Sequence, residues 1–173
     1  MKKLCTCVFF ALICGTGLAA MTDISALPAN VSGNTWTFTY TVVNSGLDAG
    51  IEEFTILFDP ELYSVIEAAA AHQPAGWDPA VWQPKPATAT FGGFDLWAQG
   101  TPPIAKGNSV SGFKVTFNWL GEGEPGSQPY EIVDVNDFAN PLEQGYTTVV
   151  PEPMTFTLLA LPAVIAAAKK RKA

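Results

Sequence analysis

The sequence predicts an all-β domain built as a two-layer antiparallel β-sandwich. Two observations support this prediction. Aromatic and branched residues alternate with polar ones in several short segments, as they do in strands that bury one face. The 173 residues also include 15 Gly and 14 Pro, which supply turns between short strands and disfavour a helical bundle. This length fits a single domain of ordinary size.

Six segments are expected to form the strands. The first begins at Trp36, its aromatic residues alternate with threonines, and Asn44 then opens an Asn-Ser-Gly turn. The segment that begins at Phe91 contains Gly92 and Gly93, where a β-bulge is expected. In chain order the six segments are residues 36–43, 54–58, 91–97, 113–119, 130–133 and 146–150.

Two of these segments should supply most of the core. Their aromatic faces are expected to meet between two sheets, because each sheet of a sandwich hides one face. The side chains concerned are Trp36, Phe38, Tyr40, Phe113, Phe117 and Trp119. Residues 68–71 are expected to form a helical turn, and residues 72–90, which contain four prolines, a long loop.

The first 20 residues have the layout of a secretory signal peptide. Two lysines precede an apolar stretch over residues 4–13, and small residues follow up to Ala20. Signal peptidase is expected to cut after Ala19 or Ala20; a short membrane anchor and a lipoprotein modified at Cys14 are the alternatives. All three cysteines lie in this leader, so the exported domain would contain no disulfide, thiolate metal site or Cys nucleophile.

The C-terminal segment, residues 150–173, combines three features in a fixed order. Pro151, Glu152 and Pro153 form a stiff step that disfavours helix. Residues 154–168 are apolar and uncharged, but as a helix they would reach only about 22 Å, less than the ~30 Å apolar core of a bilayer. A basic cluster then stops this marginal transmembrane helix and should stay on the cytoplasmic side. It consists of Lys169, Lys170, Arg171 and Lys172.

This order of Pro-Glu-Pro, short apolar helix and basic end resembles the PEP-CTERM sorting signal of Gram-negative bacteria, a tail that is also labelled an ice-binding protein C-terminal domain. The resemblance implies recognition by an exosortase, a transient stay in the inner membrane, and then a place at the cell surface or outside the cell. It also implies an association with exopolysaccharide and biofilm. A permanent tail anchor that is never cut is the alternative. The resulting division is a signal peptide over 1–20, a β-sandwich over 21–149 and the sorting signal over 150–173.

Charge is distributed unevenly along the chain. All 16 Asp and Glu residues fall within residues 21–153, and only three lysines lie among them. A nucleic acid needs cationic groups over its phosphates, so such an acidic domain argues against nucleic acid as a partner.

Three residues are candidates for catalysis, and none is expected to be catalytic. His72 is the single histidine of the chain and falls in the proline-rich loop, without a nucleophile-elbow motif elsewhere. Glu122 and Glu124 could form a glycosidase pair, but two glutamates in a Gly/Pro turn are more often solvated charges. The domain is therefore expected not to be an enzyme and to need no cofactor.

Two sets of residues are candidates for binding. Trp77, Trp82 and Trp97 fall in or beside loops, where exposed rings could stack on the apolar faces of sugars; burial as anchors of the loops is the alternative. A second set offers oxygen ligands of the kind that Ca²⁺ prefers, without a full calcium-loop spacing. Its members are Asp134, Asn136 and Asp137.

The domain also bears a short resemblance to known surface modules. Residues 51–63, with the run FTILFDPELY, are similar to a strand and turn of cohesin-like and other Ig-like bacterial surface domains. The function expected from all of this is that of an exported, exosortase-sorted, non-enzymatic surface or extracellular-matrix protein. A carbohydrate-binding module that uses the loop tryptophans is the first alternative, and a small hydrolase is the second.

Overall fold

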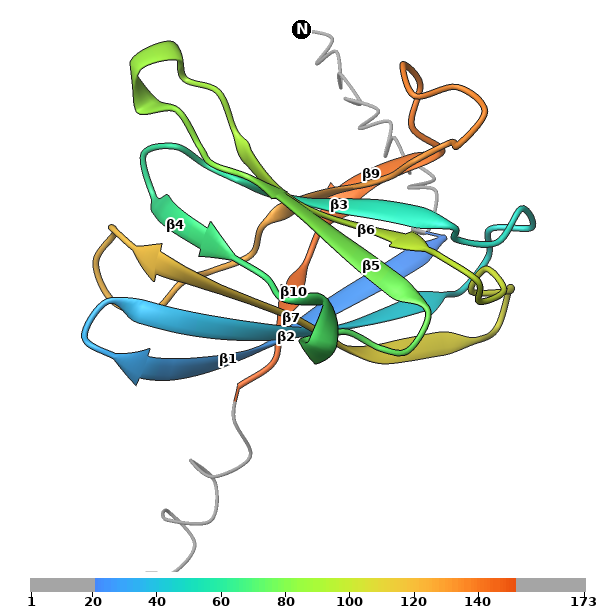
Figure 1. Ribbon diagram of the computed structural model, residues 1–173, viewed down its shortest axis with the longest axis horizontal. Coiled ribbons are helices and arrows are strands. Elements are labelled where there is room, and N and C mark those ends of the chain that lie inside the picture. The colour runs from blue at the N-terminus through green and yellow to red at the C-terminus, as the bar shows by residue number, and fades with distance from the viewer. Residues whose placement is uncertain (1–20, 152–173) are drawn as a thin grey trace, which may run out of the picture.

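The structure is a computed structural model, and it describes residues 21–151 as two five-stranded sheets packed face to face (Figure 1). The described part of the chain is therefore an all-β sandwich, as predicted. The signal peptide over 1–20, Glu152, Pro153, the apolar stretch and the basic end lie outside the described residues. Within residues 21–151, no helix has the length and hydropathy needed to cross a bilayer.

The first sheet has the strand order β10-β1-β2-β7-β4. Its strands are antiparallel apart from β10, which runs parallel to β1. The β1–β2 hairpin turns at Gly33, whose φ of 55° lies in the left-handed region that favours glycine. The strands are β1 (Thr22–Ser32), β2 (Thr35–Asn44), β4 (Tyr63–Glu67), β7 (Ser109–Trp119) and β10 (Thr148–Val149).

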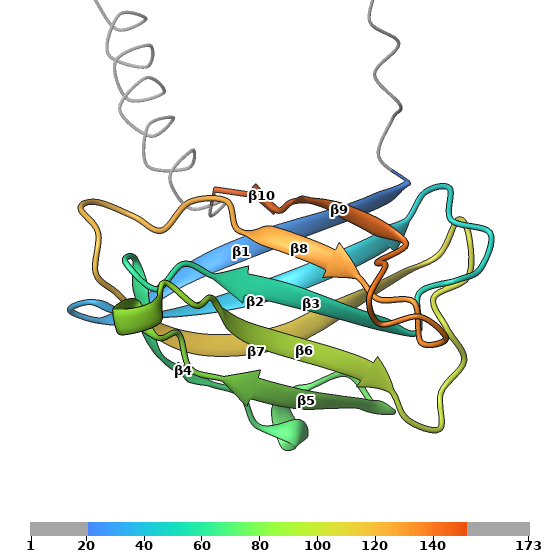
Figure 2. The same ribbon diagram turned by 90° about the horizontal axis from the view of Figure 1, so that it is seen from above.

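The second sheet is antiparallel throughout, with the order β5-β6-β3-β8-β9. Figure 2 shows this sheet in front of the first one. Two short 3₁₀ turns, η1 (Ala70–His72) and η2 (Pro86–Thr88), flank β5. The strands are β3 (Glu53–Phe58), β5 (Trp77–Trp82), β6 (Gly92–Ala98), β8 (Pro129–Ile132) and β9 (Glu143–Tyr146).

The core between the sheets is strongly aromatic. Phe38, Tyr40, Phe113 and Phe117 are fully buried, whereas Trp36 and Trp119 are half-buried at its margin. These six side chains meet in one core, as predicted, but they all come from one sheet, because β2 and β7 are neighbours in the first sheet. The second sheet contributes the facing half of the core. Its fully buried members are Phe54, Ile56, Phe58, Phe94, Leu96 and Ile132.

Three strands were not predicted, and each has a local reason. β1 and β5 contain Pro28 and Pro79, which lower the strand propensity of a segment. Pro79 is tolerated because β5 is an edge strand, where a missing N–H interrupts no ladder. β4 loses its alternation at Val65, which has a φ of 51° within a bulge opposite β7.

Three further expectations need correction. Residues 72–90 are not one loop, since they contain β5. Gly92 and Gly93 form no bulge, because both pair in regular register with β3. The expected strand over 146–150 is divided between β9, which ends at Tyr146, and β10 in the other sheet. The helical turn expected over 68–71 is found as η1, which begins two residues later and ends one residue later than expected.

Candidate functional site

The outer face of the second sheet carries the features that mark a binding surface. Alternate residues of its strands point into the core, so the remaining ones point to solvent. The register places one set of outward residues in a line that crosses all five strands. We call this line the aromatic row, and it consists of Trp82, Gly93, Leu57, Pro129 and Tyr146.

Trp82 lies flat on the sheet at one end of the aromatic row. It pairs with Gly93 of the neighbouring strand, and a Cβ built on Gly93 would lie 2.1 Å from Cζ2 of the indole. The ring therefore covers the glycine backbone at a distance that any side chain at residue 93 would prevent. Trp82 is still 43 % exposed, so the other face of its indole is open to solvent. The sheet thus holds one exposed aromatic plane in a fixed position.

Tyr146 occupies the other end of the row and is 72 % exposed. Between the two ends, the half-buried side chains of Leu57 and Pro129 continue the apolar surface. An open hollow is lined by Leu57, Pro129 and Tyr146, and a second hollow shares Pro129 and Tyr146 and extends to Phe91. Apolar surface therefore continues across the sheet and over its end.

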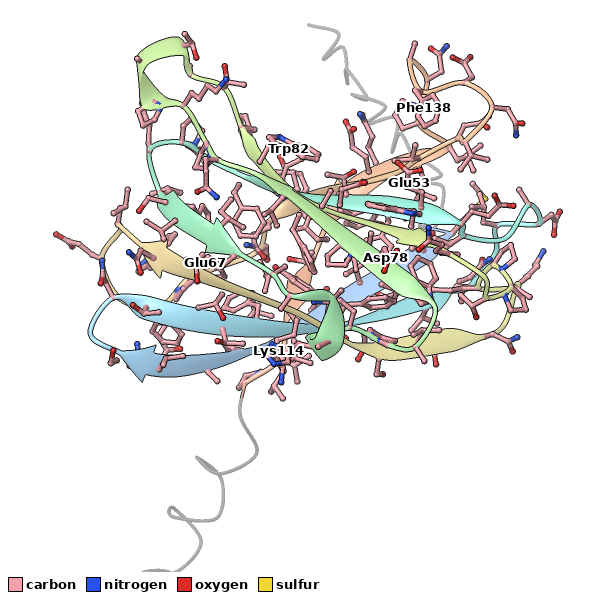
Figure 3. The ribbon with its side chains drawn as sticks, viewed as in Figure 1. Glu53, Glu67, Asp78, Trp82, Lys114 and Phe138 are labelled. Carbon is pink, nitrogen blue, oxygen red and sulfur yellow. The ribbon has the colours of Figure 1, made fainter. Side chains whose placement is uncertain are left out.

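Carboxylates lie beside the aromatic row. The five strands of the second sheet contain five Asp and Glu residues and no Lys or Arg. Asp95 and Glu131 belong to the next line of outward residues, and Trp97 pairs with Asp78 on one side and with Glu53 on the other. Figure 3 shows Trp82 and Glu53 projecting from the same side of the molecule, whereas Lys114 lies on the opposite side. This face is therefore both acidic and aromatic.

The folded protein disfavours the ionised form of two of these carboxyl groups, those of Asp95 and Glu53. Burial raises the pKa of the Asp95 carboxyl, and the hydrogen bond that Thr55 Oγ1 donates at 2.6 Å lowers it in part. Burial also raises the pKa of the Glu53 carboxyl, and the charge of Asp95 raises it further. An added positive charge at this face would relieve both effects.

The raised pKa of Asp95 predicts how stability depends on pH. A carboxyl whose folded-state pKa lies above its unfolded value holds its proton longer in the folded state, so stability falls as pH rises through that interval. Replacing Asp95 by Asn removes the ionisation and keeps an acceptor for Thr55. We therefore expect Asp95→Asn to raise the thermal midpoint at pH 7 and to leave it nearly unchanged at pH 3, measured by circular dichroism. Glu122→Gln, on an exposed loop, is the control, and a lower midpoint for Asp95→Asn at pH 7 would contradict the prediction.

The three tryptophans predicted as glycan contacts have different positions. Trp82 is exposed in the aromatic row and Trp97 is half-buried on the same outer face. Trp77 is only 4 % exposed and packs against Phe54 and Phe113 in the core. The expectation that Trp77 contacts a glycan is therefore wrong, because its position in β5 points inward.

Sequence reasoning missed the other members of the aromatic row. The sequence predicts only that Tyr146 begins a strand and that Leu57 belongs to an alternating segment, with no functional role for either residue. Neither residue stands out in the sequence, since their alignment with Trp82 depends on the strand order of the sheet. The available signal was the pair of glycines at 92 and 93, which indicates a close approach of other atoms to the backbone.

The residues weighed for catalysis lie on exposed parts of the molecule. His72 ends η1 and borders an open hollow with Glu67 and Lys114. Glu122 and Glu124 are exposed in the loop between β7 and β8. These positions match the solvated surroundings that the sequence indicated for all three side chains.

The oxygen ligands proposed for calcium hold turns of the loop after β8. Asp134 accepts a hydrogen bond from the backbone N–H of Asn136 at 2.9 Å, and Asp137 accepts one from the side chain of Asn140 at 2.8 Å. Among residues 21–151, no group of three or more His, Cys, Asp or Glu side chains is arranged to hold a metal ion. The observed role of Asp134 and Asp137 is therefore to hold turns of this loop by hydrogen bonds.

The outer face of the first sheet is chemically different. Threonines of β2 lie opposite hydroxyl side chains of β7, and their hydroxyls bond across the strands, with 2.9 Å between the oxygens of Thr37 and Thr116 and of Thr41 and Ser111. The hydroxyls therefore satisfy one another. The acidic and aromatic face of the second sheet is the stronger candidate for a binding surface.

Comparison with protein-family models finds no match, and comparison with curated proteins finds none either. Among solved structures, the chain is similar to a GH20 exo-β-N-acetylglucosaminidase from Vibrio harveyi, at 12 % identity and a TM-score of 0.40, with 76 % of this chain and 18 % of that chain covered. It is also similar to the Coh-OlpA cohesin from Clostridium thermocellum, at 17 % identity and a TM-score of 0.34, with 74 % of this chain and 99 % of that chain covered. A type I ScaB cohesin from Pseudobacteroides cellulosolvens is similar at 14 % identity and a TM-score of 0.32, with 75 % and 94 % covered. The chain thus spans 18 % of the length of the glucosaminidase.

Proposed function

We propose that this chain is an exported, non-enzymatic surface or matrix protein with an Ig-like or cohesin-like sandwich. In this proposal signal peptidase removes residues 1–20, and an exosortase recognises Pro151, Glu152 and Pro153 while the apolar tail is in the inner membrane. The mature protein then acts at the cell surface or outside the cell, in association with exopolysaccharide. One observation carries the proposal, namely that the terminal strands of the described sandwich, which begin at Thr22 and end at Val149, both lie between the two segments expected to be processed.

The C-terminal boundary of the domain supports the proposed site of cleavage. β10 pairs with β1 up to Val149, and the backbone N–H of Val150 donates a hydrogen bond to the carbonyl of Ala26 at 2.9 Å. β10 ends at Val149, and Pro151 follows two residues later with its φ fixed by the pyrrolidine ring. A cut at or after Pro151 would leave every one of these contacts in place.

The N-terminal boundary supports removal of the leader after Ala20. The backbone nitrogen of Met21 donates a hydrogen bond to Glu143 Oε1 at 2.9 Å, and β1 begins at Thr22. Cleavage between Ala20 and Met21 would turn this amide into an α-ammonium group. A charged donor strengthens a hydrogen bond to a carboxylate, so the new end would bind Glu143 more firmly.

Mass spectrometry of the mature protein tests both boundaries at once. In a host that has an exosortase, we expect an N-terminus at Met21 and a C-terminus near residues 150–154. A matched variant, Pro151→Ala together with Pro153→Ala, should keep the tail, because it removes the stiff step. Recovery of an intact Lys169–Lys172 end on most of the surface-located protein would show that the tail is a permanent anchor.

A carbohydrate-binding module is the second candidate function. It is favoured by the exposed indole of Trp82, which the contact with Gly93 holds flat on the sheet. An aromatic plane of this kind offers apolar surface to the flat face of a sugar ring. The hydrolase alternative has no comparable support, because His72 is exposed at the end of η1, whereas Glu122 and Glu124 are exposed in the loop between β7 and β8.

A further inference from the structure

We propose that the aromatic row and the carboxylates beside it bind a cationic amino-sugar polymer, that is, a polysaccharide chain with free amino groups. This inference rests on the proposed function, in which the mature protein meets extracellular polysaccharide, and it names the chemical class of that partner. Two properties of the same face, its flat apolar row and its charge, lead to this partner.

The aromatic row has the extent and flatness that an extended polymer needs. It crosses five strands, and at a spacing of about 4.8 Å between strands it spans about 19 Å. The exposed rings of Trp82 and Tyr146 stand at its two ends, with Leu57 and Pro129 between them. Sugar rings of one chain could therefore rest on several points of the row at once.

The row is also held in place before any ligand binds. The indole of Trp82 cannot move toward the sheet, because it already rests on Gly93, and the pyrrolidine ring fixes the backbone at Pro129. A surface that is ordered in advance loses less conformational entropy when it binds. The row is therefore suited to weak, repeated contacts with a polymer.

Charge determines which polysaccharide fits. Asp78, Asp95, Glu53 and Glu131 lie on the outward side of this sheet, whose five strands carry no Lys or Arg. An anionic polymer would be repelled by this face, and a neutral one would leave the carboxylates unused. Free amines would instead pair with the carboxylates and could lie against the indole faces as well.

Trp97 is a second place on this face where a sugar ring could stack on an indole while its amine pairs with a carboxylate. It lies between Asp78 and Glu53 in the register of β5, β6 and β3. Trp97 is the fourth residue after Gly93 along β6, at a distance of about 13 Å in an extended strand. An aromatic ring and two carboxylates are therefore cross-strand neighbours at Trp97, where an amine and a sugar face of the same polymer would both find a partner.

Binding is tested on the full chain, purified in a mild detergent, by isothermal titration with four probes. These are a β-1,4-linked glucosamine hexamer, its fully N-acetylated counterpart, a glucose hexamer and a lysine decamer. We expect the glucosamine hexamer to bind most tightly. We expect Trp82→Ala to weaken the affinity for this hexamer about tenfold, because the substitution removes one stacked ring. Glu53→Gln with Asp78→Asn should weaken it by a similar factor and reduce its dependence on salt.

Matched controls separate this face from the rest of the surface. Phe138→Ala removes a 73 % exposed ring outside the row, and Glu67→Gln with Asp23→Asn removes two charges from the first sheet; both should bind as the parent chain does. Equal binding of the acetylated or glucose hexamer would overturn the proposal. So would a lysine decamer that binds more tightly and is unaffected by Trp82→Ala, which would indicate a basic protein partner.

The assay is independent of how the tail is processed. If none of the four probes binds the parent chain, the proposed amino-sugar partner is overturned and the sorting proposal remains intact. Conversely, an uncut tail in cells would overturn the sorting proposal without altering the titration result.

Discussion

Replacing Phe117 by Ala is expected to lower the free energy of unfolding by about 3–5 kcal/mol, the range for removing a buried Phe side chain. Phe117 is fully buried and joins the two halves of the core. Its ring lies 5.0 Å from that of Phe38 and 5.1 Å from that of Tyr63 in its own sheet, and 5.5 Å from that of Phe58 in the second sheet. The substitution would therefore leave a cavity and also remove three edge-on aromatic contacts.

Urea unfolding followed by tryptophan fluorescence measures this effect. Phe138→Ala is the matched control, because Phe138 is 73 % exposed and surface substitutions change stability by about 0.5 kcal/mol or less. Phe117→Leu keeps most of the volume and should fall between the two. A loss below about 1 kcal/mol for Phe117→Ala would mean that the two sheets do not share this contact.

The arrangement of Phe117 illustrates what alternation in a sequence predicts well. A period of two along residues 113–119 indicates which side chains share a face, and those faces are buried as expected. Alternation does not indicate which strand lies beside which. Phe113 and Phe117 were expected to help join two sheets, yet β7 is the neighbour of β2, so the partners from the second sheet could only be found from the fold.

The strands that were missed show how context overrides local propensity. Pro79 disfavours a strand in a sequence, but at the free edge of a sheet its missing N–H has little consequence. The segment that contains it therefore pairs with β6 over six residues and places Trp77 in the core. Whether a segment lies at an edge is a property of the whole sheet, so the position of Trp77 was beyond local reasoning.

The candidate site was predicted in part for the same reason. Trp82 and Trp97 were recognised from residue type alone. Their role as parts of one surface depends on register, which aligns Trp82 with Leu57 and Tyr146 from distant parts of the chain. The positions of these residues along the chain therefore do not reveal that they form one line across five strands.

Asn44 provides the second large expected effect. The sequence placed it in a turn, but the structure shows that it is fully buried where the chain leaves β2 and crosses to the second sheet. Its side-chain amide donates hydrogen bonds of 2.9 Å to the carbonyls of Leu47 and Ile104, and its Oδ1 accepts one of 2.8 Å from the N–H of Leu47. One side chain therefore holds the crossing loop against the segment that leads into β7.

Replacing Asn44 by Ala should lower the free energy of unfolding by about 2–5 kcal/mol, because it removes three buried hydrogen bonds and leaves the N–H of Leu47 without its acceptor. The two carbonyls are less affected, since Ile104 also accepts from the N–H of Ile51 and Leu47 from that of Gly50. Asn30→Ala is the matched control, because the exposed Asn30 makes a single hydrogen bond to the Gly33 carbonyl. Urea unfolding compares the two variants, and amide hydrogen exchange should show faster exchange at Leu47 in Asn44→Ala. Equal stability of the two variants would mean that the crossing loop is held by its backbone hydrogen bonds alone.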